Sequence, residues 1–155
     1  MNKAPHWLDQ KEYAAWREFI RMQEKLIGRL ARQVQAESSL SAADYTVLVE
    51  LTEVPDGKLR FMELVRAVEW EKSRMSHQIS RMVKRGLVAR EECPDGGRGA
   101  LMAITPAGRA AITEAAPRHV EAVRRYFIEA LTPEELDSVA HISRRVLDHM
   151  EKLPS

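Results

Sequence analysis

The chain has 155 residues, 45% of them hydrophobic and 30% charged, and its 24 basic and 23 acidic side chains leave a formal net charge of +1. This composition is typical of one globular domain, and it excludes both a disordered chain and a strongly basic or polyacidic tail. Because the apolar runs are too short to cross a bilayer and the single cysteine, Cys93, has no partner for an internal disulfide, we expect a cytoplasmic protein.

The N-terminal part of the chain predicts two helices. Apolar residues recur at helical spacing from the start, so we expect a long first helix over residues 8–35. Ser41 then has the side chain of a good N-cap, and Asp44 stands at the capping-box position three residues later. This pair predicts a second helix over residues 42–53, with its apolar positions facing the core.

The middle of the chain predicts two short helices followed by a β-hairpin. We expect, in order, a short strand at 59–60, helices at 61–68 and 73–85, and strands at 87–93 and 100–104. Gly86 suits the position that follows the end of a helix, and the glycine-rich loop 94–99 joins the last two strands. A helix, a tight turn, a second helix and a hairpin in this order predict a winged helix-turn-helix.

Two more helices are predicted at the C-terminal end. Thr105 and Pro106 are typical of the N-cap and the first residue of a helix. Pro117 lies inside that helix, so we expect a kink or a break just before it. Residues 132–135 form a capping box with proline at the first helical position, and they predict the start of a last helix.

These elements predict a single domain of residues 1–155 that is mainly α, with α+β character. A winged helix-turn-helix lobe occupies residues 40–111, and long helices at 8–35 and 118–153 flank it. An isolated winged helix needs neither of these long helices, and their apolar stripes need a partner. We therefore expect them to form a dimerisation layer between two copies of the chain.

The residues from 72 to 90 have the clearest charge bias in the chain. They include six lysines and arginines and no carboxylate, a pattern compatible with a nucleic-acid reader whose basic surface is confined to one element. A solvated helix whose cations only keep the chain soluble is the alternative. It is disfavoured because no acid alternates with the cations and a glycine-rich hairpin follows.

The predicted helix over 73–85 has one polar face, which carries Arg74, His77, Gln78 and Arg81. Arginine pairs bidentately with guanine and glutamine with adenine in the major groove, and serines near a helix N-terminus suit phosphates. An arginine at the hairpin tip fits a narrow minor groove, although an exposed turn arginine without DNA contact is the alternative there. The predicted DNA-binding residues are Lys72, Ser73, Arg74, Ser76, His77, Gln78, Arg81, Lys84 and Arg98.

Residues 40–111 resemble a MarR-family transcriptional regulator. The resemblance rests on an ordered set of stretches: LSAADYTVL at 40–48, SRMSHQISRM at 73–82, RGLV at 85–88 and ITPAG at 104–108. The flanking helices also match the family's layout, so the resemblance covers nearly the whole chain. The hairpin departs from the family's Asp-x-Arg, because two glycines separate Asp95 from Arg98. The resemblance therefore carries over the groove contact of Arg98 but not the usual Asp–Arg brace.

The resemblance implies a homodimer that binds a pseudo-palindromic operator and represses transcription. Each copy would place residues 73–85 in a major groove and its hairpin in the adjacent minor groove. Members of the family often bind small anionic phenolic or lipophilic effectors between the dimer layer and the DNA-binding lobe. By the same resemblance, Trp16, Tyr45 and Val123 would line such a cleft in this chain.

Two other functions stay open on the sequence. A winged-helix protein-interaction module without specific DNA binding would share this fold, although the carboxylate-free segment disfavours it. A DNA-binding regulator without an effector would differ only in lacking the ligand cleft. The five histidines have no metal-ligand spacing, and no nucleophile–base arrangement or phosphate loop is present, so we expect neither an enzyme nor a cofactor or metal.

Overall fold

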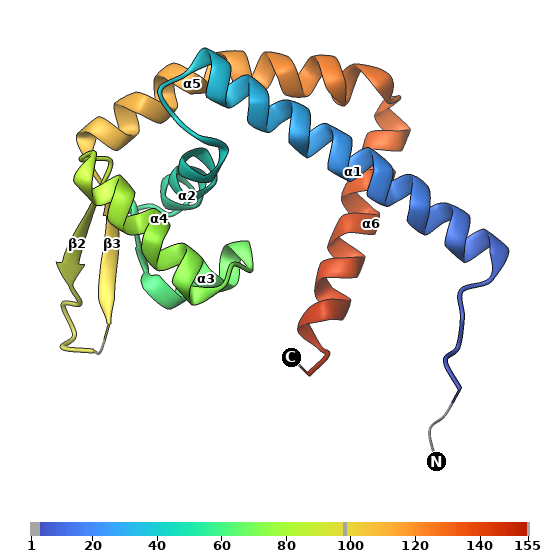
Figure 1. The fold of residues 1–155 in the computed structure, drawn as a ribbon, viewed down its shortest axis with the longest axis horizontal. Coiled ribbons are helices and arrows are strands. Elements are labelled where there is room, and N and C mark those ends of the chain that lie inside the picture. The colour runs from blue at the N-terminus through green and yellow to red at the C-terminus, as the bar shows by residue number, and fades with distance from the viewer. Residues whose placement is uncertain (1–3, 98, 155) are drawn as a thin grey trace. The chain divides into compact units, whose positions relative to one another are not determined.

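The computed structural model describes residues 4–97 and 99–154. In chain order its elements are α1 (Gln10–Glu37), α2 (Ala42–Thr52), β1 (Lys58–Arg60), α3 (Phe61–Val68), α4 (Lys72–Lys84), β2 (Val88–Glu92), β3 (Ala100–Ile104), α5 (Pro106–Tyr126), the 3-10 helix η1 (Ile128–Ala130) and α6 (Pro133–Glu151). The predicted fold class, mainly helical with a winged helix-turn-helix, is confirmed (Figure 1). The chain divides into two compact units, one ending at His119 and the other beginning at Val120.

A small antiparallel sheet joins the helix-turn-helix to its wing. The strand order is β1-β3-β2, so β3 lies between the other two. On β3, Met102 is opposite Leu59 of β1 on one side and Arg90 of β2 on the other. The hairpin of β2 and β3 extends beyond one end of α4 in Figure 1. Both the predicted hairpin and the short strand before α3 are confirmed.

The hydrophobic core of the first unit holds α4 by one face. Met75, Ile79 and Met82 are completely buried, as their helical spacing predicts. They share one cluster with residues from the neighbouring elements, among them Val34, Leu48, Leu51, Leu64, Met102 and Ile112. Burial of these side chains sets the rotation of α4 about its axis, and the opposite face of the helix is left to solvent.

Local capping sets where three of the helices begin. The predicted capping boxes that begin at Ser41 and Thr132 are both present, and they start α2 and α6. A third box, with Asp9 as its N-cap, starts α1 at Gln10, two residues later than predicted. Each box satisfies backbone N–H groups that the first turn of a helix would otherwise leave without a partner.

The sequence predicts a kink or a break just before Pro117, and the structure excludes the break. The helix α5 runs without interruption from Pro106 to Tyr126 with this proline inside it. Proline has no N–H, so the carbonyl of Thr113 loses its helical donor. Both Thr113 and Pro117 are exposed, so water has access to that carbonyl, and the helix continues.

Gly108 allows the first turn of α5 to lie directly against the chain that leads into β2. A Cβ atom at this position would lie 2.2 Å from the carbonyl oxygen of Leu87 and 3.0 Å from Cγ1 of Ile104. The nearer of these two atoms belongs to the backbone, which is unable to rotate away as a side chain would. The close approach therefore requires glycine.

Replacing Gly108 with alanine should lower the free energy of unfolding by about 2 kcal/mol, because the added methyl overpacks this contact. Gly28→Ala on α1 is the matched control, since its new Cβ would meet only the flexible end of Arg32, at 3.4 Å. Alanine is the better helix former, so the control should gain up to about 1 kcal/mol. Urea denaturation of the two variants measures the difference, and equal midpoints would contradict the clash.

Candidate nucleic-acid interface

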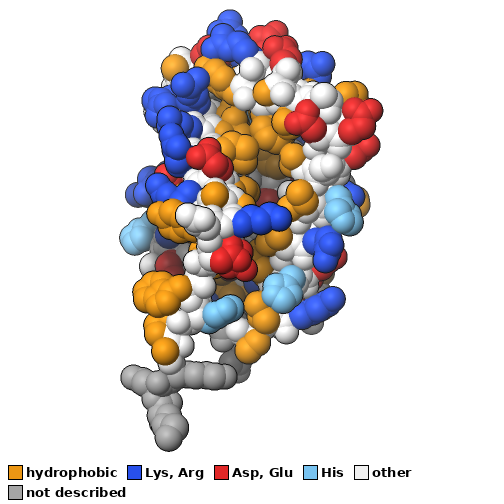
Figure 2. Space-filling view, turned by 90° about the vertical axis from the view of Figure 1, so that its right-hand side faces the viewer, with side chains coloured by type: hydrophobic (Ala, Val, Ile, Leu, Met, Phe, Trp, Pro, Cys, Tyr) orange, Lys and Arg blue, Asp and Glu red, His pale blue; other side chains and the backbone are white. Residues whose placement is uncertain are grey.

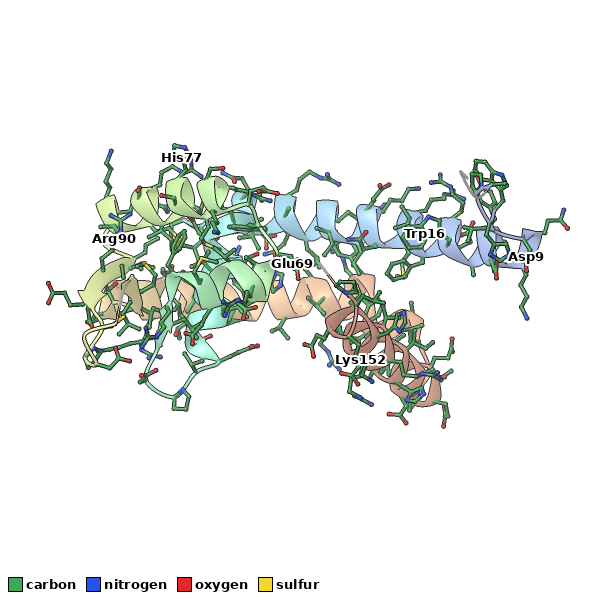
Figure 3. All side chains as sticks on the ribbon, turned by 90° about the horizontal axis from the view of Figure 1, so that it is seen from below. Asp9, Trp16, Glu69, His77, Arg90 and Lys152 are labelled. Carbon is green, nitrogen blue, oxygen red and sulfur yellow. The ribbon has the colours of Figure 1, made fainter. Side chains whose placement is uncertain are left out.

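The outer face of α4 carries most of the predicted DNA-binding side chains. Those of Lys72, Ser73, Arg74, Ser76, His77, Arg81 and Lys84 are exposed. Figure 3 shows His77 on the outer side of α4, pointing away from the rest of the winged helix. Because residues 72–90 contain no carboxylate, no acid of α4 itself offsets these cations. The result is a basic helix face of the kind that approaches DNA phosphates.

The structure corrects the expectation for Gln78. Only 3% of this residue is exposed. Its Nε2 donates a hydrogen bond to Oδ1 of Asp44 at 2.6 Å, and its Oε1 accepts one from Nη2 of Arg81 at 2.7 Å. Helical spacing alone places Gln78 at the edge of the polar face, and α2 then covers it. The amide is therefore used inside the protein, and Gln78 is not part of the exposed polar face on which the sequence placed it.

Asp44 ties the start of α2 to α4. This residue is 2% exposed, and its carboxylate accepts a hydrogen bond from the backbone N–H of Ser41, one from Gln78 and one from Nη1 of Arg85 at 2.6 Å. The second nitrogen of Arg85 donates to the backbone oxygen of Ser39 at 2.7 Å. Arg85 is thus withdrawn from the cationic face, and one carboxylate of α2 binds both Gln78 on α4 and the residue that caps the end of α4.

The surroundings of Asp44 favour its charged form. Burial raises the pKa of this carboxyl, but the N–H of Ser41, the guanidinium of Arg85 and the amide of Gln78 together lower it, and the pKa lies below its ordinary value of 3.8. The sequence showed Asp44 only as part of a capping box. No pattern within one helix indicates its bonds to residues 34 and 41 positions further along.

The wing is held by ion pairs with β1. Asp95 accepts a hydrogen bond from Nη2 of Arg60 at 2.5 Å and another from the backbone N–H of Gly97 at 3.0 Å. The N–H of Gly97 and the charge of Arg60 lower the pKa of Asp95. Lys58 pairs with Glu91 at 2.8 Å. Arg98 lies outside the described residues, so its groove contact stays a prediction.

Trp70 was not predicted as a functional residue, yet it contacts Arg74, which the sequence predicts to bind DNA. It lies in the connection between α3 and α4, and the guanidinium carbon of Arg74 is 4.0 Å from the centroid of its ring. The one signal in the sequence for this contact was that Trp70 stands four positions before Arg74, a spacing at which two side chains of one helix meet. Since Trp70 precedes α4 rather than belonging to it, that spacing did not indicate contact.

A small cavity lies beside one of the three predicted effector residues. Tyr45 is half-buried and lines a cavity of about 200 Å³, together with Ile27, Leu30, Ala31, Val34, Ala42, Thr46 and His119. The ring of Tyr45 is 4.5 Å from that of His119, whose Nδ1 is 3.2 Å from Oε1 of Gln33. Burial raises the pKa of Tyr45 and lowers that of His119.

The two other predicted effector residues do not line this cavity. Trp16 is 53% exposed on α1, with its ring centroid 6.2 Å from that of Phe19. Val123 is half-buried in the second unit.

Over residues 4–97 and 99–154, no helix is long and apolar enough to span a membrane. Within the same residues, no group of three or more His, Cys, Asp or Glu side chains is placed to hold a metal ion.

Comparisons with known proteins agree with this geometry. A family model described as MarR family matches residues 38–99, whereas no curated protein matches the chain. AbsC, a MarR family transcriptional regulator from Streptomyces coelicolor, is 34% identical with a TM-score of 0.87, over 96% of this chain and 100% of that one. Sco3205, a regulator of the same family and organism solved in complex with DNA, is 36% identical with a TM-score of 0.86, over 96% of both chains.

A third solved structure shares the fold at lower identity. BpsR from Bordetella bronchiseptica is 24% identical with a TM-score of 0.73, over 94% of this chain and 99% of that one. Its DNA binding is described as regulated by 6-hydroxynicotinic acid. At this identity the likeness shows the fold alone.

Proposed function

Because the chain belongs to the MarR family of transcriptional regulators, we propose that it represses transcription as a cytoplasmic homodimer on a pseudo-palindromic operator. The observation that carries the proposal is the outer face of α4, where exposed cations stand without a neighbouring carboxylate of the same helix. Sco3205, at 36% identity, was solved in complex with DNA. Two copies related by a two-fold axis would read two half-sites one helical turn apart.

The exposed side chains of α4 divide into two roles. We assign base contacts to Arg74 and Arg81, with His77 beside them, because arginine is the side chain best suited to guanine in the major groove. Backbone phosphates would be bound by the remaining exposed polar residues of α4, Lys72, Ser73, Ser76 and Lys84. The wing would carry Arg98 to the adjacent minor groove.

Exposed apolar side chains on α1 and α6 support the dimer. Those that are more than half exposed include Tyr13, Trp16, Phe19 and Ile27 on α1 and Ile142, Val146, Leu147 and Met150 on α6. Hydrophobic atoms reach the surface among the charged ones in Figure 2. A monomeric protein rarely leaves this much apolar surface in water, so we propose that a second copy covers it.

Operator selection tests the proposed function. Incubation with a pool of random duplexes should enrich a pseudo-palindrome, and the affinity for it should fall steeply as salt rises, because phosphate contacts release counterions. A scrambled duplex of the same length is the control and should bind far more weakly. If no sequence is enriched and no duplex binds at low salt, the protein-interaction module is the better interpretation.

The base contact of Arg74 has its own expected result. Arg74→Ala should weaken operator binding by about 1–3 kcal/mol and relax the sequence preference at one position of each half-site. Arg118→Ala, which removes the same charge from an exposed position on α5, is the matched control. Titration against the operator and its single-base variants measures the effect. An equal loss on every sequence would reassign Arg74 to phosphate.

We further propose that the cavity beside Tyr45 binds a small aromatic effector that alters operator affinity. Its walls are mainly apolar, and Tyr45, Thr46 and His119 supply polar atoms. Its volume of about 200 Å³ is large enough for one aromatic ring, because a somewhat smaller apolar cavity holds benzene. The test is to add small aromatic acids, 6-hydroxynicotinic acid among them, to the complex of the protein with labelled operator and to measure how much operator is released. If none releases it, the regulator without an effector is favoured.

A further inference from the structure

The turn between α3 and α4 has an unusual backbone conformation. Within the described residues, Glu69 is the one non-glycine residue with a positive φ, 56°. It ends α3 in the left-handed conformation that normally favours glycine. Such strain persists only where surrounding contacts hold it, and it often marks a functional position. Trp70 is the next residue after this turn.

Trp70 connects the hydrophobic core to the exposed side of α4. Its side chain is half-buried and packs against the core cluster, which restricts the movement of the ring. Its face lies against the guanidinium of Arg74, whose carbon is 4.0 Å from the ring centroid. A cation at this distance from the face of an indole is attracted by the ring's quadrupole.

The arginines of this region are held in different ways. Arg81 donates to Gln78, and Arg85 donates to Asp44 and Ser39. The side chain of Arg74 has neither a hydrogen bond nor an ion pair with any residue of the described chain, and its guanidinium lies over the ring of Trp70. The guanidinium of Arg74 is therefore held over the ring of Trp70, and none of its N–H groups donates to a described residue, so they are free to bind a base.

We propose that Trp70 is a positioning residue that determines the base specificity of Arg74. An arginine side chain that is already ordered loses less freedom when it binds. The ring attracts the charge of the guanidinium and takes up none of the oxygen or nitrogen acceptors of a base, so Trp70 orders Arg74 and leaves its N–H groups available for guanine. This inference rests on the proposed function, because it requires that α4 reads a DNA operator.

A double-mutant cycle on the selected operator tests the inference. The proteins compared are the wild type, Trp70→Leu, Arg74→Ala and the double variant. Leucine keeps an apolar contact with the core but has no aromatic face. Trp70→Leu should lower operator affinity about fivefold and reduce discrimination at the base pair that depends on Arg74. In the Arg74→Ala background the same change should have no effect.

Two controls make the outcome decisive. Trp70→Phe keeps a ring and should recover most of the affinity; if Trp70→Leu fails to fold, the cycle is completed with Trp70→Phe, whose weaker stacking should give a smaller loss of the same kind. The slope of affinity against salt should not change, because no phosphate contact is removed. An equal loss with and without Arg74, or an equal loss at every base pair, overturns the inference. If the wild type selects no operator, the proposed function itself fails, and the inference fails with it.

Discussion

Replacing Asp44 with alanine should lower the free energy of unfolding by about 3 kcal/mol, because it leaves a buried network without its acceptor. The N–H of Ser41, the amide of Gln78 and the guanidinium of Arg85 would all lose the same carboxylate. The side chain of Arg85 is 43% exposed, so solvent screens part of its ion pair. The hydrogen bonds and the helix cap account for most of the expected loss.

Urea denaturation measures this loss against a matched control. Glu114→Ala removes a carboxylate from an exposed position on α5, and such surface changes stay within about 0.5 kcal/mol. Asp44→Ala should also weaken operator binding, since Asp44 holds Gln78 and through it Arg81 on the outer face of α4. If Asp44→Ala were as stable as Glu114→Ala, the network would contribute nothing to the fold.

The pH dependence of stability identifies the charged form of Asp44. Its pKa in the folded protein lies below the ordinary value of 3.8, so the unfolded chain takes up a proton first as the pH falls. The stabilisation is complete above the ordinary pKa and is lost as the pH falls through the folded pKa. The difference in stability between the wild type and Asp44→Asn should therefore be constant at neutral pH and shrink below about pH 4. A difference that grows in acid would have the wrong sign.

The second large effect is expected at the proposed dimer interface. Val146→Asp should raise the dimer dissociation constant at least a hundredfold, because a carboxylate buried in an apolar contact loses its hydration. Val146 is 52% exposed on α6, and Ile142, Leu147 and Met150 are exposed apolar residues of the same helix. In a two-fold dimer each substitution occurs twice, so the two penalties add.

Light scattering with size-exclusion chromatography measures the mass of the variant. Arg144→Asp is the matched control, since Arg144 is also exposed on α6 but lies about 200° around the helix from Val146. The control should remain dimeric and bind the operator, whereas Val146→Asp should elute as a monomer and lose most operator affinity. A dimeric Val146→Asp would exclude this stripe of α6 from the interface.

The sequence by itself determined the order of the α-helices and strands and the face that α4 buries. The capping boxes that begin at Ser41 and Thr132 and the buried stripe of Met75, Ile79 and Met82 were all predicted and are present. These features depend on residues one or two helical turns apart, because capping and amphipathic burial are local effects. The position of a residue in a helix determines on which face its side chain lies, and this does not depend on residues outside the helix.

Only the tertiary structure decided which polar residues on that helix are free to act. Gln78 is 34 positions from Asp44, and Asp95 is 35 positions from Arg60, so no local pattern joins them. Which donor meets which acceptor depends on the elements that the core brings together, and a buried carboxylate binds the donors that reach it. Packing therefore withdrew Gln78 from the predicted DNA-binding surface.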